Sequence, residues 1–379
     1  MSEKKAEVAD RLLAHAAPEL PFVRVDAYNA ELREAEGFVG DRASKRAFAE
    51  ILTDWRERLE RLGGDPLGDT PTEKLSKKKL EKILVSGDPE AAALVQGAIE
   101  EFAQELASVV RRFLRLKSWQ GTERIAIGGG FRDSRIGELV VGRAALLLKS
   151  DRIDIDLVPI THHPDEAGLI GAIYLAPPWI FAGHDAILGV DIGGSNIRAG
   201  LVELRGKRNH DFAGSRVREC ALWRHRDDKP KRDEAVERLI GMLEEMIDRA
   251  DKKKLKLAPF IGIGCPGIIE EDGAIERGGQ NLPGNWESSR FNLPQAIRDG
   301  IPKIDGHDAV IVMHNDAVVQ GLSEVPNMQD VRHWGVFTIG TGLGNARFTN
   351  KKTEIRRRHA HIVAAIMFLI CSSRRSTLA

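Results

Sequence analysis

This sequence of 379 residues has few cysteines, no net charge and no long apolar run. The three cysteines, Cys220, Cys265 and Cys371, are scattered, which excludes a disulfide framework and any CxC or CxxC metal-binding knuckle. We therefore expect no structural zinc and a reducing, cytoplasmic location. Lysine plus arginine and aspartate plus glutamate both number 56, so no global field attracts nucleic acid or an anionic membrane.

Segments typical of secretion or membrane insertion are also lacking. The N-terminus, MSEKKAEVADRL, carries charges where a signal peptide would have an apolar core. The most apolar run, Ile362–Cys371, has roughly ten residues, which is about half of a membrane span. The sequence thus predicts no membrane and no nucleic-acid partner.

The length allows two domains with sizeable cores, and the pattern along the chain predicts an α/β fold. The N-terminal part is predicted to be helical, with helical spacing from Phe48 to Leu62, and Asp88-Pro89 opens a longer helix that ends near Leu116. The lysine-rich segment Lys74–Lys82 favours a solvated helix face over a nucleic-acid patch. From Ile125 onward, short apolar strands alternate with helices.

The segment Leu188–Glu203, LGVDIGGSNIRAGLVE, predicts two strands joined by a glycine turn. Glycines at such a turn let backbone N–H groups approach an anion, and Asp191 at the strand end can hold a hydrated Mg²⁺ beside it. The pattern therefore favours nucleotide phosphates. A plain turn between two strands explains this segment equally well when it is taken alone.

Further glycine and polar clusters follow other predicted strands. Gly340–Gly344 (GTGLG) could wrap a second phosphate edge, and Gly128-Gly129-Gly130 could accept a flat base or ribose. His314-Asn315-Asp316 lies where open α/β sheets place their active sites, so that Asp316 could accept a proton from a hydroxyl. The alternative is that Asp316 only caps the helix predicted over Ala317–Glu324.

Two other motifs carry less information. Ile261–Gly267 (IGIGCPG) formally matches GxGxxG, but Pro266 and the absence of a following helix argue against a dinucleotide fold. The loop Asn281–Trp286 (NLPGNW) offers an amide for sugar hydroxyls and an apolar face, although a surface turn would look the same.

Taken together, these segments resemble the ROK family of sugar kinases and sugar-responsive regulators. The matching motifs are DIGGSNIR, GIGCPG, NLPGNW, HNDAVVQGLSE, IGTGLG, RIAIGGG and the helix DEAGLIGAIYLA, within residues 87–345. The resemblance implies an actin/hexokinase-like (ribonuclease H-like) α/β fold of two domains with a cleft between them. The larger domain would comprise residues 1–164 and 319–379, and the smaller one residues 165–318.

The order of the motifs differs from that of the family. The segment with RIAIGGG and AGLIGA, which closes family members, here precedes the first phosphate loop and is joined to it by the linker Pro177–Asp185. A circular permutation explains this order, because permutation succeeds where chain ends lie close together. A fusion of two incomplete domains is the competing account. The family's zinc motif and its Glu-x-Gly-His loop are not found, and Glu36–Ser44 resembles the latter only faintly.

The resemblance implies ATP-dependent phosphorylation of a sugar hydroxyl, with Mg²⁺ held near Asp191 through water. Asp316 would be the general base. A non-catalytic sugar-sensing protein is the alternative, a homodimer is left open, and an acyl-phosphate or polyphosphate donor is not excluded. The implied contacts are Asp191, Gly193, Gly194, Ser195, Arg198, Gly340, Thr341, Gly342 and Gly344 for phosphates, Gly128, Gly129 and Gly130 for adenosine, and Asn281, Asn315, Asp316 and Glu324 for the sugar.

Overall fold

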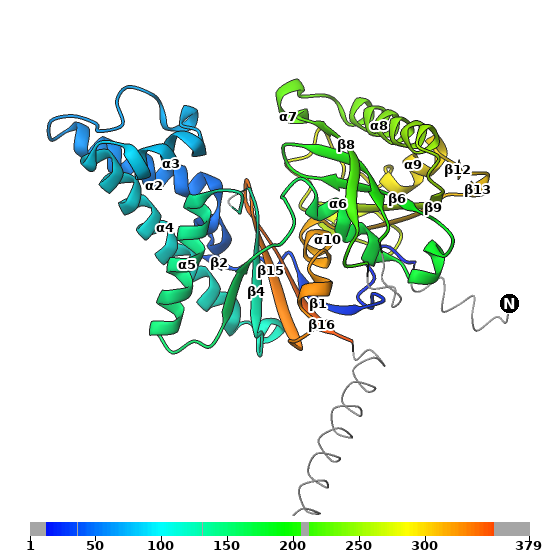
Figure 1. Ribbon diagram of the computed structural model, residues 1–379, viewed down its shortest axis with the longest axis horizontal. Helices are drawn as coiled ribbons and strands as arrows, with labels where there is room; N and C mark the ends of the chain where they lie inside the picture. Colours follow the sequence, from blue (N-terminus) through cyan, green and yellow to red (C-terminus); the bar gives the residue numbers. More distant parts are fainter. Residues whose placement is uncertain (1–12, 36, 131, 206–211, 352–379) are drawn as a thin grey trace, which may run out of the picture.

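The structure is a computed structural model, and it describes residues 13–35, 37–130, 132–205 and 212–351. Two five-stranded sheets stand side by side, with helices on their outer faces and between them (Figure 1). This arrangement confirms the α/β class that the alternation of strands and helices predicts.

The first sheet combines strands from both ends of the described chain. β15 and β16 form an antiparallel hairpin, β1 pairs antiparallel with β16, and β4 and β5 continue in parallel on the other side of β15. The strand order across this sheet is β1 (Val23–Tyr28), β16 (Leu343–Asn350), β15 (His333–Ile339), β4 (Arg124–Gly129) and β5 (Asp156–Pro159).

The second sheet has the same plan and is built from one stretch of chain. β6 and β7 form its central hairpin, β8 adds antiparallel to β7, and β9 and β14 continue in parallel beyond β6. The order is β14 (Val310–Asn315), β9 (Leu257–Cys265), β6 (Ala186–Ile192), β7 (Ile197–Glu203) and β8 (Arg216–Trp223).

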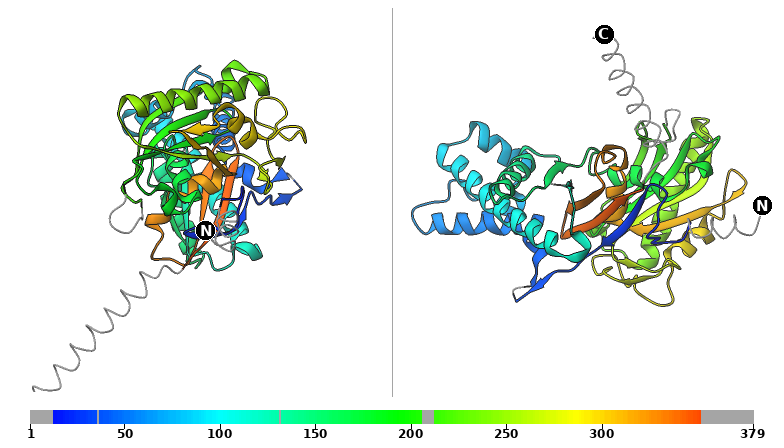
Figure 2. Two further views of the ribbon diagram at one scale, coloured as in Figure 1. Left: turned by 90° about the vertical axis from the view of Figure 1, so that its right-hand side faces the viewer. Right: turned by 90° about the horizontal axis from the view of Figure 1, so that it is seen from below.

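Comparison of the two sheets identifies the part played by β1. In the second sheet the central strand, its hairpin partner and the third strand follow one another in sequence as β6, β7 and β8. In the first sheet the central strand β15 and its hairpin partner β16 come late in the chain. The strand that pairs with β16, in the position that β8 has in the second sheet, is β1 near the N-terminus. The two ends of the described chain are therefore neighbours in one sheet, as the views in Figure 2 also show.

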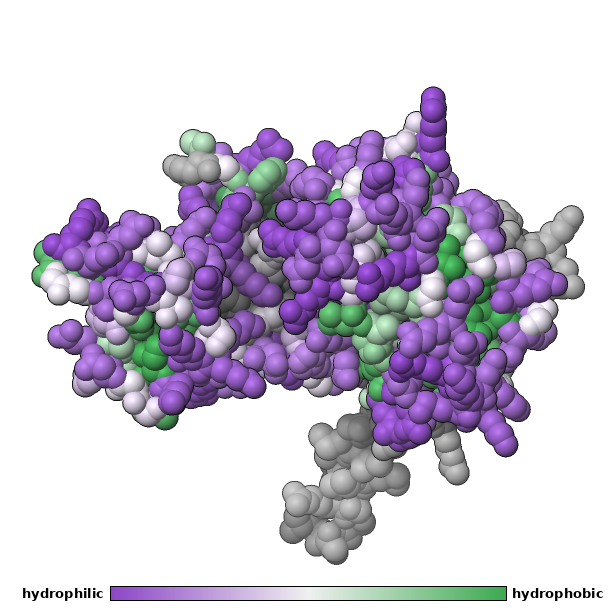
Figure 3. All heavy atoms as spheres, turned by 90° about the horizontal axis from the view of Figure 1, so that it is seen from above, coloured by the Kyte–Doolittle hydropathy of each residue, from purple (hydrophilic) through white to green (hydrophobic). Residues whose placement is uncertain are grey.

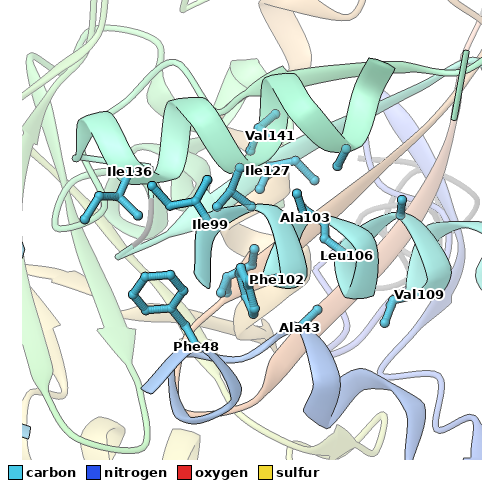
Figure 4. Close-up of a cluster of buried hydrophobic side chains, with 14 of the residues drawn as sticks. Ala43, Phe48, Ile99, Phe102, Ala103, Leu106, Val109, Ile127, Ile136 and Val141 are labelled. Carbon is cyan, nitrogen blue, oxygen red and sulfur yellow. The ribbon is translucent and has the colours of Figure 1, made fainter. Parts of the chain in front are cut away.

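Helices α2 (Lys45–Glu60), α3 (Lys77–Ser86), α4 (Pro89–Arg115) and α5 (Arg135–Ser150) cover the outer face of the first sheet. Their apolar stripes meet in one buried cluster, in which Phe48 of α2 lies edge-on to Phe102 of α4 and Ile127 reaches in from β4 (Figure 4). Burial of these stripes is the main stabilising term for such amphipathic helices. α8 (Arg232–Lys252) and α9 (Leu293–Gly300) cover the second sheet in the same way.

A middle layer separates the two sheets. It consists of α6 (Ala167–Gly171), the 3₁₀ turn Ala172–Leu175 and α10 (Asp316–Leu322), whose apolar side chains join one core with residues of both sheets. The two helices touch closely, because a Cβ atom on Gly171 would lie 2.8 Å from the carbonyl carbon of Val319. Only glycine fits there, so α6 fixes the position at which α10 begins.

The remaining elements are short and lie in connections. The helix α7 (His225–Asp228) precedes α8, and the 3₁₀ turns are Val39–Ala43, Thr72–Lys74, Lys117–Trp119, Pro178–Phe181 and Val325–Asn327. The small hairpins are β2 (Arg33–Glu34) with β3 (Gly37–Phe38), β10 (Ile268–Ile269) with β11 (Ile275–Arg277), and β12 (Lys303–Ile304) with β13 (His307–Asp308).

Most predicted elements are confirmed, including the helix that opens at Asp88-Pro89, where the Asp88 carboxylate caps the N–H groups of Glu90 and Ala91. The prediction of a helical N-terminal part is wrong for β1. Its sequence, VRVDAY, alternates apolar and polar residues as an edge strand should. None of the helices within the described ranges combines the length and apolar composition that a bilayer crossing requires.

The chain after β1 is fastened to β16 by Asn345, which is 2% exposed. Its Oδ1 accepts a hydrogen bond from the N–H of Ala30 at 2.9 Å, and its Nδ2 donates to the Ala30 carbonyl at 3.2 Å. Its backbone carbonyl accepts from the N–H of Asn29 at 2.9 Å. This clasp sets where the segment following β1 enters the space between the sheets.

We expect Asn345→Ala to lower the free energy of unfolding by about 2–3 kcal/mol, because both side-chain bonds are lost and the Ala30 backbone groups stay partly buried. Urea unfolding measures the change. Gln104→Ala is the matched control, since that amide makes one exposed bond to Glu100, and it should cost less than about 0.5 kcal/mol. Equal effects of the two substitutions would show that the clasp contributes nothing.

Candidate functional site

A cleft of about 430 Å³ lies between the two sheets at the ends of their central strands. The surface is hollowed between the two halves of the molecule, and hydrophilic side chains surround the hollow (Figure 3). Of the residues predicted from the sequence, the structure brings these to the lining of this one cleft: Asp191, Gly193, Gly194, Ser195, Arg198, Asn281, Asp316, Gly340, Thr341, Gly342, Gly344, Gly129 and Gly130.

Two glycine turns face each other across the cleft. The turn between β6 and β7 is closed by a hydrogen bond from the Gly193 N–H to the Asn196 carbonyl at 2.8 Å. A Cβ atom on Gly194 would lie 2.9 Å from the Cβ of Asn281, so this turn and the NLPGNW loop are in direct contact. The opposite turn, between β15 and β16, is closed by a bond from the Gly340 N–H to the Gly342 carbonyl at 2.9 Å.

Gly129 ends β4 beside the second glycine turn and must be glycine. Its φ of +81° is unfavourable for any residue with a side chain, and a Cβ atom would lie 2.7 Å from the backbone nitrogen of Ile339. The backbone of β4 can therefore approach β15 closely at this end.

Asp191, on β6, lies deep in the cleft and is 2% exposed. Its Oδ2 accepts from Arg198 on the paired position of β7 at 3.1 Å, and Arg198 also donates to Asp165 at 2.6 Å. Its Oδ1 is buried and has no hydrogen-bond partner in the described part of the chain. Burial raises the pKa of Asp191, whereas the nearby Arg198 lowers it.

Asp316 is the first residue of α10, directly after β14. Enclosure by the cleft walls, and then the negative charge of Asp191, raise the pKa of the Asp316 carboxyl from 3.8 to about 7. A carboxyl group with such a pKa exchanges a proton near neutral pH, which is the property that general acid–base chemistry needs.

The structure differs from the sequence predictions for Asn315 and for the cap of α10. The cap is Asn315, not Asp316: its Oδ1 accepts from the N–H groups of Ala317 and Val318, and its Nδ2 donates to the Gly267 carbonyl. Asn315 is 2% exposed and does not line the cleft, and both its Oδ1 and its Nδ2 are engaged in bonds within the protein. It acts by holding Asp316 at the helix start.

Glu324 and Gly128 also lie outside the lining of the cleft. The Glu324 carboxylate is buried and accepts from the N–H of Thr161 at 2.6 Å and from its hydroxyl at 2.9 Å, so it joins the chain after β5 to the end of α10. Gly128 is paired within the sheet with Thr338. The substrate contact of Glu324 and the adenosine contact of Gly128 therefore stay predictions from the resemblance.

The sequence reasoning missed several residues of the lining. Asn29, Glu31 and Lys45 come from the segment that follows β1, and Asp165 and Gln320 come from the middle layer. The expectation for Glu36–Ser44 falls partly outside the described residues, because Glu36 is not described. The remainder lies against the chain that follows the second glycine turn, since a Cβ atom on Gly40 would lie 3.3 Å from the Cβ of Leu343.

The residues present fit a hydrated magnesium ion. Mg²⁺ keeps several waters and binds through one or two carboxylates together with substrate phosphates, and the unpaired Oδ1 of Asp191 is a suitable oxygen. Elsewhere the described ranges contain no group of three or more His, Cys, Asp or Glu side chains placed to hold a metal.

A family model matches part of the chain and gives the same family as the motifs. Residues 187–362 match the model of the ROK family, which confirms the resemblance for this part of the chain. The glucokinase of Thermotoga maritima is 26% identical over 164 residues, which are 43% of this chain and 44% of that protein. A protein of Listeria monocytogenes described as a proposed N-acetylmannosamine kinase is 22% identical, with a TM-score of 0.32, over 44% of this chain and 47% of its own.

The chain spans less than half the length of these two relatives in the matched regions. The plan shared by its two sheets, a three-stranded antiparallel unit extended by two parallel strands, is that of the actin/hexokinase-like fold implied by the ROK resemblance.

The raised pKa of Asp316 has a measurable consequence for stability. Between about pH 4 and pH 7 the folded protein holds a proton at Asp316 that the unfolded chain releases, so this group lowers stability as pH rises. We expect Asp316→Asn to remove this penalty. The free energy of unfolding of Asp316→Asn minus that of wild type should be roughly 2–4 kcal/mol larger near pH 8.5 than near pH 4.

Chemical denaturation at the two pH values measures this difference. Asp308→Asn, at an exposed aspartate of β13, is the matched control and should show no dependence on pH. A gain for Asp316→Asn that is the same at both pH values would mean that the carboxyl of Asp316 has an ordinary pKa.

Proposed function

We propose, starting from the ROK match of residues 187–362, that this chain transfers the terminal phosphoryl group of ATP to a hydroxyl group of a sugar. The observation that carries the proposal is the meeting of both glycine turns, Asp191 and Asp316 in one cleft. The glycine turns suit a phosphate chain, and a carboxyl with a pKa of about 7 suits a general base.

In the proposed reaction the sugar hydroxyl attacks the γ-phosphorus, a new P–O bond forms, and the bond to the β-phosphate oxygen breaks. Asp316 accepts the hydroxyl proton, and ADP leaves with the electrons of the broken bond. Phosphoryl transfer depends mainly on positioning and on neutralisation of charge, so the backbone N–H groups of Gly194–Ser195 and Thr341–Gly342 would supply much of the catalysis. Mg²⁺ bound near Asp191 would neutralise phosphate charge.

The acceptor sugar would lie at the end of the cleft formed by Asn281, Gln280 and the segment that carries Asn29 and Glu31. Amide and carboxylate groups of this kind bind sugar hydroxyls through paired donors and acceptors. Asn29 lies close to this wall, because its Nδ2 is 3.5 Å from where a Cβ atom on Gly278 would be. Adenosine would lie at the other end, beside Gly129, because the Lys45 side chain passes over Gly130.

The rotated order of the motifs fits a circular permutation better than a fusion of two incomplete domains. A fusion predicts two partial sheets, whereas β1 takes the third place of the first sheet and leaves both sheets with five strands. In this account the chain is opened between β16 and β1, and the segment Pro177–Asp185 joins the former ends.

A screen of sugar-dependent ADP release tests the function. The full chain with Mg²⁺ and ATP is assayed against hexoses, amino sugars and N-acyl amino sugars, with tripolyphosphate as an alternative donor. We expect turnover with at least one sugar class and ATP. Binding of nucleotide and sugar with no release for any sugar would instead favour the non-catalytic sugar-sensing function.

We expect Asp316→Asn to lower kcat by about 10²–10⁴-fold, because the hydroxyl proton loses its acceptor. Steady-state kinetics measures this loss. The affinity for Mg-ADP, measured by calorimetry, should change less than about threefold, since Asp316 contacts the acceptor and not the donor. Asp308→Asn is again the control. A variant that remains fully active would exclude Asp316 as the general base.

A further inference from the structure

Lys45 occupies a defined place at the mouth of the cleft. It is the first residue of α2, and its backbone N–H donates to the Gly340 carbonyl at 3.0 Å. Ser44 caps the helix by accepting from the N–H of Ala47 at 3.2 Å. The start of α2 is therefore fastened directly to the second glycine turn, and the Lys45 side chain lines the cleft beside it.

The Lys45 side chain passes over Gly130, which ends the third glycine cluster. A Cβ atom on Gly130 would lie 2.6 Å from the Cε of Lys45, so a larger residue there would displace the lysine. Lys77, the first residue of α3, reaches the same point, and its Nζ donates to the Gly130 carbonyl. Two ammonium groups from two helix starts thus meet at one glycine.

The two ammonium groups differ in their surroundings, because the carboxylates of Asp133 and Glu81 act on Lys77, whereas Lys45 has no carboxylate at ion-pair distance in the described ranges. The Lys45 ammonium makes no ion pair or hydrogen bond with any residue of the described ranges. Arg198, the other cation of the cleft, is already paired with Asp165 and Asp191. Burial, and then the charges of Lys77 and Arg198, lower the pKa of Lys45, whereas the charge of Asp165 raises it.

We propose that Lys45, supported by Lys77, binds the non-bridging oxygens of a phosphoanhydride chain lying between Gly130 and the Gly340–Gly344 turn. Lysine binds phosphate as a compact point charge, and a phosphate chain would supply the missing negative charge. The inference rests on the proposed function for the identity of the ligand. It adds a side-chain cation to a site otherwise built from backbone N–H groups.

Binding measurements on the full chain separate the phosphate contact from the rest of the site. We expect Lys45→Ala to weaken binding of Mg-ADP and of Mg-tripolyphosphate by about 10–100-fold, the range for hydrogen bonds to charged groups. Adenosine, which has no phosphate, should bind with unchanged affinity, and this also shows that the variant is folded. Lys45→Arg should recover most of the loss.

Arg46→Ala is the matched control, because Arg46 is the next residue of the same helix. Its side chain is 65% exposed, pairs with Asp41 at 3.7 Å and Glu50 at 3.4 Å, and does not line the cleft. Its removal should leave all three affinities within about twofold of wild type. The two ligands with phosphate also distinguish the donors, since preference for tripolyphosphate over ADP would identify a polyphosphate site.

The outcomes separate this inference from the proposed function. If Lys45→Ala binds Mg-ADP and Mg-tripolyphosphate as wild type does, the role of Lys45 is overturned while kinase activity can stand. If the variant loses binding of both but wild type phosphorylates no sugar, Lys45 keeps its role and the kinase proposal fails. A wild-type chain that binds neither ligand would overturn both.

Discussion

The pairing of β1 with β16 is the contact on which the rest of the structure depends. It gives the first sheet its third strand and satisfies backbone groups of β16 that would otherwise form an open edge. Asn345 then fastens the chain at Ala30, so that Asn29, Glu31 and the start of α2 reach the cleft. One strand pairing therefore delivers an entire wall of the candidate site.

The middle layer sets the chemistry of the other wall. α6 and α10 pack closely enough that Gly171 lies against Val319 and Gly168 against Asp191, where a Cβ atom would be 2.6 Å from the carboxyl carbon. This packing buries most of Asp191 and places Asp316 at the start of α10. The raised pKa of Asp316 follows from enclosure and from the neighbouring negative charge, rather than from the residue type.

Charge is distributed unevenly along the cleft. The carboxylates of Asp191 and Asp316 lie at its base, whereas Lys45 and Lys77 lie at the rim beside Gly130. The backbone turns between these groups add N–H donors without competing side chains.

The sequence alone determined the local features: the hairpin around Asp191, both glycine turns, and the strand–helix junction at Asp316. Each depends on residues within a few positions, through turn geometry and apolar periodicity. Tertiary structure decided which residues share the cleft. Lys45 meets Gly340 only because sheet pairing joins segments some three hundred positions apart. Tertiary structure also made Asn315 the cap of α10 and placed Glu324 next to Thr161. Hydrogen-bond partners of this kind depend on packing between distant segments, which a local sequence pattern does not predict.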